Sequence, residues 1–122
     1  MCTHYNAEGI IESVEWRAQI NAELERAKQA RARGNEGQAR VCARRAAGIA
    51  AREYFAQQGK SIRTPSAYDV LNLLAEEPLI SADLKQSAAY LTLRVNEEFK
   101  LPVNVDLIAE ARKLCEVLLK DQ

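Results

Sequence analysis

Histidine is almost missing from this chain: the only one among 122 residues is His4, near the start. A phosphotransfer bundle needs a histidine on a helix, and His4 precedes the first predicted helix. A di-iron bundle needs Glu-x-x-His pairs, which are missing, so we expect neither class. Serines without a histidine offer no familiar nucleophile arrangement. A phosphate loop of the GxxxxGK[ST] type is also missing, so any nucleotide would have to be held by side chains. We therefore expect no catalytic residues, no metal and no cofactor.

Aromatic residues and strand-forming runs are scarce as well. Two Phe and one Trp accompany many Ala and Leu, which favours closely packed helices over a sheet. No period-two run bounded by turn signals is present. No stretch approaches 18 apolar residues, and the first residues lack the basic start and apolar run of a secretion signal. These absences predict an all-α protein with no membrane association, located in the cytoplasm.

Cysteine is limited to Cys2, Cys42 and Cys115. Three widely spaced cysteines with no C-x-x-C motif argue against a disulfide framework and against a zinc site. Cys42 and Cys115 lie within apolar patterns, so we expect both to be small buried thiols.

The chain does contain five segments of helical character, separated by glycine, asparagine and proline. They are predicted at about 10–33, at about 36–58, after a capping Ser66, after Ser81, and from a capping Asn104 near the end. Gly59 is expected to close the second segment in a left-handed conformation. Residues 1–122 are therefore predicted to form one domain, an antiparallel up-down four-helix bundle with an additional short helix. A tetratricopeptide solenoid is the alternative, but only one such helix-turn-helix unit is visible.

Charge is unevenly distributed although the net charge is zero. Residues 26–63 hold ten bases and two acids, whereas the segments before and after them each carry a net charge of −4. A concentrated basic segment can attract phosphate or an acidic partner.

The stretch "ARVCARRAAGIAAREYF" (residues 39–55) places four arginines in an apolar helix. At about 100° per residue its alanines form one face, which we assign to the intramolecular core. Val41, Gly48 and Phe55 form the opposite face, and an interior glycine indicates a close neighbour because it costs about 1 kcal/mol relative to alanine. This second face is a candidate interface of a homodimer. The alternative is that both faces are covered within one chain.

The arginines lie along the shoulders of this helix. A phosphate-binding groove would use Arg44, Arg45 and Arg52, and Lys60 and Arg63 could add charge from the following loop. Tyr90 or Tyr54 could stack on a base. The alternative is a solvated face whose arginines pair with acids such as Glu23 and Glu53. Glu53 is also the carboxylate to inspect for an unrecognised active site.

Four segments of the chain resemble the HEPN family of small helical bundles. "WRAQINAELERAKQARARGN" is similar to the first helix of the family, and residues 39–55 to its second, with Arg45-Ala46 where many members have Gln-Ala. "TPSAYDVLNLL" is similar to the segment in which members often carry His-Asp-Leu, and "DLIAEARKLCEVLL" to the closing helix.

This resemblance implies a homodimer, often encoded with a small nucleotidyltransferase, and in some branches a ribonuclease. Such ribonucleases use an arginine followed a few residues later by a histidine. Arg94 in "LTLRVNEEFKLP" corresponds to that arginine, but Phe99, Lys100 and Leu101 occupy the positions for the histidine. The general base is missing, so the resemblance implies a HEPN-like protein without ribonuclease activity.

Two functional hypotheses follow from these observations. In the first, a non-catalytic HEPN-like dimer binds a nucleotide, RNA or a partner such as a nucleotidyltransferase, with Arg44, Arg45, Arg52 and Arg94 supplying charge and Tyr90 available for stacking. In the second, the same arginines meet an acidic protein surface, and the chain is an interaction or structural module with no nucleotide ligand.

Overall fold

The computed structural model describes the backbone of residues 3–93 and 105–119, and the side chains of residues 15–93 and 105–119. Its regular elements are helices, and the described residues contain no strand. In chain order they are α1 (Thr3–Ala32), α2 (Glu36–Gln57), α3 (Ala67–Ala75), α4 (Ala82–Leu91) and α5 (Leu107–Leu118). The predicted all-α class is confirmed. None of the helices in these ranges is long and apolar enough to cross a membrane.

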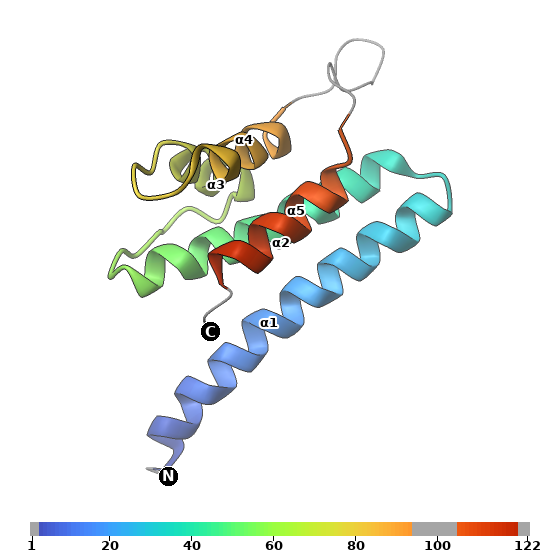
Figure 1. Cartoon of the computed structure of the whole chain (residues 1–122). Helices are drawn as coiled ribbons and strands as arrows, with labels where there is room; N and C mark the ends of the chain where they lie inside the picture. Colours follow the sequence, from blue (N-terminus) through green and yellow to red (C-terminus); the bar gives the residue numbers. More distant parts are fainter. Residues whose placement is uncertain (1–2, 94–104, 120–122) are drawn as a thin grey trace.

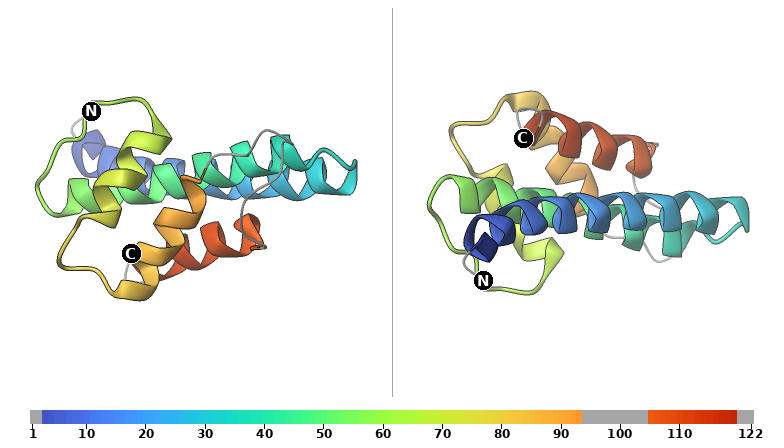
Figure 2. Two further views of the ribbon diagram at one scale, coloured as in Figure 1. Left: turned by 90° about the horizontal axis from the view of Figure 1, so that it is seen from above. Right: turned by 90° about the horizontal axis from the view of Figure 1, so that it is seen from below.

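The two long helices, α1 and α2, form an antiparallel hairpin, and α5 lies beside both of them (Figure 1). The short helices α3 and α4 pack against each other and against another side of α2 (Figure 2). In this arrangement α2 contacts each of the other four helices and forms the centre of the fold. One long hairpin with three shorter helices is less regular than the bundle predicted from the sequence.

The ends of the helices follow local chemistry. The Ser66 side chain accepts a hydrogen bond from the Asp69 backbone N–H and begins α3, as predicted. Gly59 has a φ of +81° and lies just after α2, which confirms the left-handed cap. For α5 the cap is Asp106, which accepts from the backbone N–H groups of Ile108 and Ala109. The predicted cap, Asn104, lies outside the described residues.

Small side chains build the core of α2. Ala39, Ala43, Ala46 and Ala50 are fully buried, which confirms the alanine face as part of the intramolecular core. The thiol of Cys115 on α5 lies 3.6 Å from the Ala46 carbonyl oxygen, so α5 covers this face closely. Cys42 and Cys115 are both free and buried, as predicted. Helices can approach this closely because alanine leaves little side chain between their backbones.

Candidate functional site

Two arginines on the flanks of α2, Arg44 and Arg52, donate hydrogen bonds to backbone carbonyls of the same chain. The Nε atom of Arg44 donates to the Leu91 carbonyl oxygen at 2.7 Å, at the end of α4. The Nη1 atom of Arg52 donates to the Thr64 carbonyl oxygen in the loop before α3. Carbonyls near the ends of helices have no intrahelical partner, and a guanidinium group satisfies them well. Arg44 and Arg52 therefore attach α4 and the α2–α3 loop to α2.

Between these two arginines in the sequence, Gly48 lies in close contact with the start of α3. A Cβ atom added at Gly48 would lie 2.6 Å from the Cβ atom of Ala67, at the start of α3. Phe55, one of the residues predicted with Gly48 to form a dimer interface, is only 4% exposed. Val41, the third, is half-buried. The close neighbour of Gly48 is Ala67 of the same chain, so Gly48 does not support a dimer interface. The alternative prediction, that the same chain covers this face, agrees with Gly48 and Phe55.

The remaining residues of the predicted phosphate site are Arg45, Tyr90 and Arg94. Arg45 is exposed and forms no ion pair with any described residue. Tyr90 is half-buried and packs against the hydrophobic core. Arg94 lies outside the described residues. The structure therefore leaves Arg45 as the accessible cation of the three predicted on α2.

The predicted catalytic candidate, Glu53, has an ordinary environment. It is half-buried, and its Oε2 atom accepts a hydrogen bond from the Gln57 side chain at 3.3 Å. Both residues lie on the same helix, one turn apart, so the contact is local. Nothing in this environment points to catalysis.

A cluster at the end of α2 was not predicted from the sequence. Glu77, between α3 and α4, is 6% exposed, and its Oε2 atom lies 3.6 Å from Nζ of Lys60. The same Lys60 ammonium lies 5.7 Å from the centre of the Phe55 ring. Burial and the negative charge of Glu77 raise the pKa of Tyr54. The cluster joins the α2–α3 loop to the α3–α4 turn.

A second unpredicted cluster joins three helix ends. Arg31, at the end of α1, donates to Glu36 at the start of α2 and to Asp106 before α5. The distances are 2.7 Å to Glu36 Oε2 and 2.9 Å to Asp106 Oδ1. Burial acts to raise the pKa of Asp106, but Arg31 and the N–H groups of Ala109 and Ile108 together hold it below its ordinary value. This ion-pair cluster fixes α5 to the turn of the α1–α2 hairpin.

Away from that fixed end, α1 and α5 separate and leave a hollow of about 450 Å³. We call this feature the α1–α5 groove. Its lining residues come from the two helices and the residue after α5: Trp16, Arg17, Ile20, Asn21, Leu24, Arg112, Cys115, Glu116 and Leu119. Trp16, Ile20 and Leu24 are four residues apart along α1, so they form one apolar stripe on the floor. The spacing of this stripe in the sequence indicates a core face of a helix and gives no signal of a groove.

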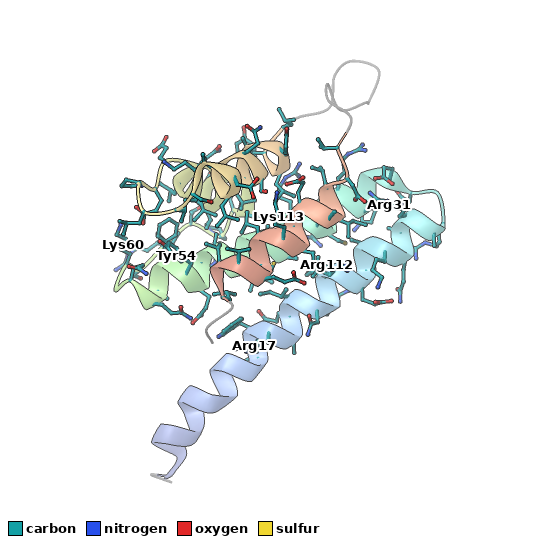
Figure 3. All side chains as sticks on the ribbon, in the orientation of Figure 1. Arg17, Arg31, Tyr54, Lys60, Arg112 and Lys113 are labelled. Carbon is teal, nitrogen blue, oxygen red and sulfur yellow. The ribbon has the colours of Figure 1, made fainter. Side chains whose placement is uncertain are left out.

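The rim of the groove is charged, and Figure 3 shows Arg17 on α1 and Arg112 on α5. The Arg17 guanidinium lies 5.0 Å from the centre of the Trp16 ring, a cation–π distance. Neither arginine forms an ion pair with a residue in the described ranges. Among the described lining residues Glu116 is the one acid, so their formal charge is +1.

The thiol of Cys115 lies in the wall of the groove but is not a reactive group. Burial, together with the charge of Glu116, raises its pKa to about 12 against the opposing effect of Arg112. A thiol with this pKa is protonated near neutral pH and is therefore a poor nucleophile. Within the described ranges, no cluster of three or more His, Cys, Asp or Glu residues could hold a metal ion.

Comparisons with known proteins give no family for this chain, because no protein-family model matches it and neither a curated protein nor a solved structure shows a significant match. The resemblance to the HEPN family thus stays a prediction from the sequence.

Proposed function

We propose that this chain is a non-catalytic interaction module that binds a helical protein segment in the α1–α5 groove. The observation that carries the proposal is the pairing of an apolar floor with two rim arginines that have no ion-pair partner among the described residues. This is the second hypothesis from the sequence, but with a different surface: the groove replaces the arginine flank of α2.

The spacing of the apolar residues along the groove favours a helix as occupant. Its floor is the Trp16, Ile20 and Leu24 stripe, which repeats once per turn along α1. An amphipathic helix laid into such a groove presents apolar residues at the same spacing. A tryptophan at the centre of an interface is also a frequent source of binding energy.

The charges of the rim favour a partner segment that carries carboxylates. Arg17 and Arg112 stand on opposite walls, one on α1 and one on α5. Carboxylates beside the apolar face of a bound helix could pair with both guanidinium groups. A basic helix of the same shape would bring like charges together, which costs binding energy.

The proposal can be tested with two synthetic amphipathic peptides that share one apolar face, one with glutamates beside it and one with lysines. Trp16 is the only tryptophan of the chain and lines the groove, so its fluorescence reports occupancy directly. We expect the acidic peptide to give a saturable change in Trp16 emission. The basic peptide should bind with an affinity at least about tenfold lower.

The matched variants are Arg17→Glu with Arg112→Glu, which reverses the rim, and Arg45→Glu, which reverses an exposed arginine on α2. The first should abolish the preference for the acidic peptide, and the second should leave it unchanged. Equal responses to both peptides, or no response at millimolar peptide, would overturn the proposal.

A second candidate function is nucleotide or RNA binding through α2, as the HEPN resemblance implies. The observation that favours it is the exposed Arg45, which has no ion pair with a described residue and lies in the most basic part of the chain. Against it, Arg44 and Arg52 already donate to carbonyls. The homodimer, the nucleotidyltransferase partner and the cytoplasmic location predicted from the sequence belong to this second candidate.

Fluorescence anisotropy of a labelled RNA at low salt separates this candidate from the first. RNA binding through α2 should weaken in Arg45→Glu and fall with added salt, because phosphate contacts release counterions. An RNA affinity that Arg45→Glu leaves intact, or no binding at all, would dismiss the second candidate.

A further inference from the structure

The α3 helix and the turn after it combine exposed leucines with acidic side chains. Leu79, in the turn, is 75% exposed, and Leu73 on α3 is 44% exposed. The neighbouring Leu71 and Leu74 are fully buried, so the two exposed leucines take no part in the core. Covering exposed apolar surface favours association by about 25 cal/mol for each Å² removed from water. Leu73 and Leu79 are therefore accessible to a partner.

Three exposed residues of this region lie on one face of α3. Asp69 and Leu73 are four residues apart, and Glu76, the C-cap of the helix, follows three residues later. Residues at these spacings are neighbours on the surface of a helix. We call these three residues, together with Leu79 in the following turn, the α3 outer face. It places two leucines beside two carboxylates.

The α3 outer face carries negative charge that the described part of the chain leaves without an ion pair. Residues 64–84 contain four acids and no lysine or arginine. One of these acids, Asp83, pairs with Lys113 of α5 at 3.4 Å. Asp69 and Glu76 form no ion pair with a residue of the described ranges. A partner that approaches this face therefore meets two carboxylates that can still pair with its cations.

The fourth acid, Glu77, lies next to this face and is incompletely paired. Its side chain is 5% exposed, and its Oε2 atom accepts no hydrogen bond from any described residue. Nζ of Lys60 lies 3.6 Å from this atom, too far for a hydrogen bond. The Lys60 side chain is 56% exposed, so a cation reaches Glu77 from the surface of the molecule. A buried carboxylate gains from a hydrogen-bonding donor, and a second cation can therefore compete with Lys60.

We propose that the α3 outer face binds a basic segment of another protein, in which an apolar residue lies between lysines or arginines. The apolar residue covers Leu73 and Leu79, and the cations pair with Asp69 and Glu76. At the edge of the face, a cation of the partner competes with Lys60. The acids select a protein segment of this kind over a nucleic acid, because phosphate groups would meet like charge.

This interaction surface is separate from the α1–α5 groove, so the inference does not rest on the proposed function. Among the described helices, α1 contacts α2 and α5 but neither α3 nor α4. Figure 1 shows α3 and α4 on the side of α2 away from α1. The two surfaces also differ in charge, since the groove has a basic rim and the α3 outer face is acidic.

The probe is a short dye-labelled synthetic peptide with one leucine between lysines, added to the full chain at low salt. Fluorescence anisotropy of the dye detects binding anywhere on the protein, whereas Trp16 emission detects only the groove. We expect saturable binding with no change in Trp16 emission. The control peptide has serine in place of the leucine and should bind about tenfold more weakly, because it covers no apolar surface.

Three substitutions test the residues of the surface. Leu79→Ser and Glu76→Lys should each lower the affinity for the lysine peptide about tenfold, the first by removing apolar contact and the second by placing like charges together. Lys60→Ala should raise the affinity about threefold, because it removes a competing cation.

Matched controls repeat the first two changes elsewhere. Val117→Ser removes a 45% exposed apolar side chain from α5, and Glu25→Lys reverses an exposed carboxylate on α1. Both variants should bind the lysine peptide as the wild type does. Circular dichroism verifies that every variant is folded, which is expected for exposed substitutions.

The absence of saturable binding at millimolar peptide would overturn the inference. An affinity that Leu79→Ser or Glu76→Lys leaves intact would also overturn it, as would equal losses in the two control variants, which indicate binding without a defined surface. A Trp16 response that follows the anisotropy would place the peptide in the groove instead. An affinity that Lys60→Ala lowers or leaves unchanged would contradict the competition at Glu77.

Discussion

The two sides of α2 differ in how their neighbouring helices pack. Arginines join loop and helix to α2 on one side, and arginines line a groove on the other. On the side of α3 and α4, Gly48 and the two arginines bring backbone and loop close to α2. On the side of α1 and α5, one ion-pair cluster around Arg31 holds one end, and beyond it the helices separate around a hollow. Gly48 and carbonyl acceptors close the first side. On the second side the alanines of α2 pack closely on α5, and the hollow lies between α1 and α5, where large apolar side chains line it.

The contrast is clearest in the arginines. Arg44 and Arg52 reach carbonyls of this chain, whereas Arg17 and Arg112 stand at the rim of a groove. Sequence alone does not separate these roles, because a guanidinium group can donate to phosphate, carboxylate and carbonyl oxygens. Their different roles depend on which acceptors the tertiary structure places within reach.

The largest expected effect compares a leucine from each side. Leu71 on α3 is fully buried, and Leu24 on α1 lines the groove at 8% exposure. We expect Leu71→Ala to lower the free energy of unfolding by about 3–5 kcal/mol, because the closed side leaves a cavity. Leu24→Ala should cost about 2 kcal/mol, since the leucine already borders empty space. Urea unfolding followed by circular dichroism gives both values.

Leucine is replaced by alanine at both positions, so the difference between the two losses of unfolding free energy measures how closely each leucine is packed. Equal costs would mean that the groove is filled in solution and would remove the contrast between the two sides. If the acidic peptide fills the groove, the cost of Leu24→Ala should be larger in the presence of the peptide, while that of Leu71→Ala should not change.

A smaller effect is expected from two glycines of α2. Gly48→Ala should destabilise the fold by about 1–2 kcal/mol despite the better helix propensity of alanine, because its Cβ would meet Ala67. Gly37→Ala is the control: a Cβ there would meet only the Asn35 side chain at 3.9 Å. We expect Gly37→Ala to be neutral or stabilising.

Thermal unfolding of the two variants and of Gly48→Ala combined with Ala67→Gly completes the comparison. The second substitution removes the Ala67 Cβ and should recover part of the loss beyond the sum of the single effects. A Gly48→Ala variant more stable than the wild type would show that the α2–α3 contact is looser than described.

The smallest effect concerns the closed end of the groove. The pKa of Asp106 is lowered in the folded chain, so its carboxylate stabilises the fold above its unfolded pKa of about 4. That contribution is lost as the pH falls through the lower folded pKa. We expect Asp106→Asn to cost less than about 1 kcal/mol at neutral pH, because the side chain is partly solvated and screened.

Urea unfolding between pH 7 and pH 2.5 tests this sign. The difference in unfolding free energy between the wild type and Asp106→Asn should shrink as the pH falls below about 4, because the pKa of Asp106 is lowered in the folded chain. Glu25→Gln, which removes an exposed carboxylate 3.6 Å from Lys28, is the control and should change stability by less than about 0.5 kcal/mol at neutral pH. A gap between wild type and Asp106→Asn that widens in acid would contradict the assigned role of Arg31.

Local signals in the sequence predicted the helices well, and their errors have local causes. The second helix was placed within one residue, because Asn35 and Gly59 both mark its ends. The first helix begins seven residues before the expected Ile10, since Gly9 does not interrupt it. His4, predicted to precede the first helix, therefore lies in α1, and the prediction against a phosphotransfer bundle from its position was wrong. The start of α5 was placed at Asn104 instead of Asp106, because both residue types are good caps and spacing cannot separate them.

The candidate site was predicted less well. The sequence identified Arg44, Arg45 and Arg52 from their charge, but their use depends on the carbonyls of Leu91 and Thr64, which are distant along the chain. The apolar stripe from Trp16 to Leu24 was visible as a face of a helix, yet periodicity does not tell whether another helix covers that face fully.

The sequence by itself determined the helical class, the alanine face of α2, the buried thiols and the caps at Ser66 and Gly59. Each of these follows from a local pattern of residue types along the chain. The tertiary structure alone decided that Gly48 meets α3, that Arg31 joins three helix ends, and that α1 and α5 separate around a groove. The angle at which helices cross depends on many distant contacts at once, and no local pattern encodes it.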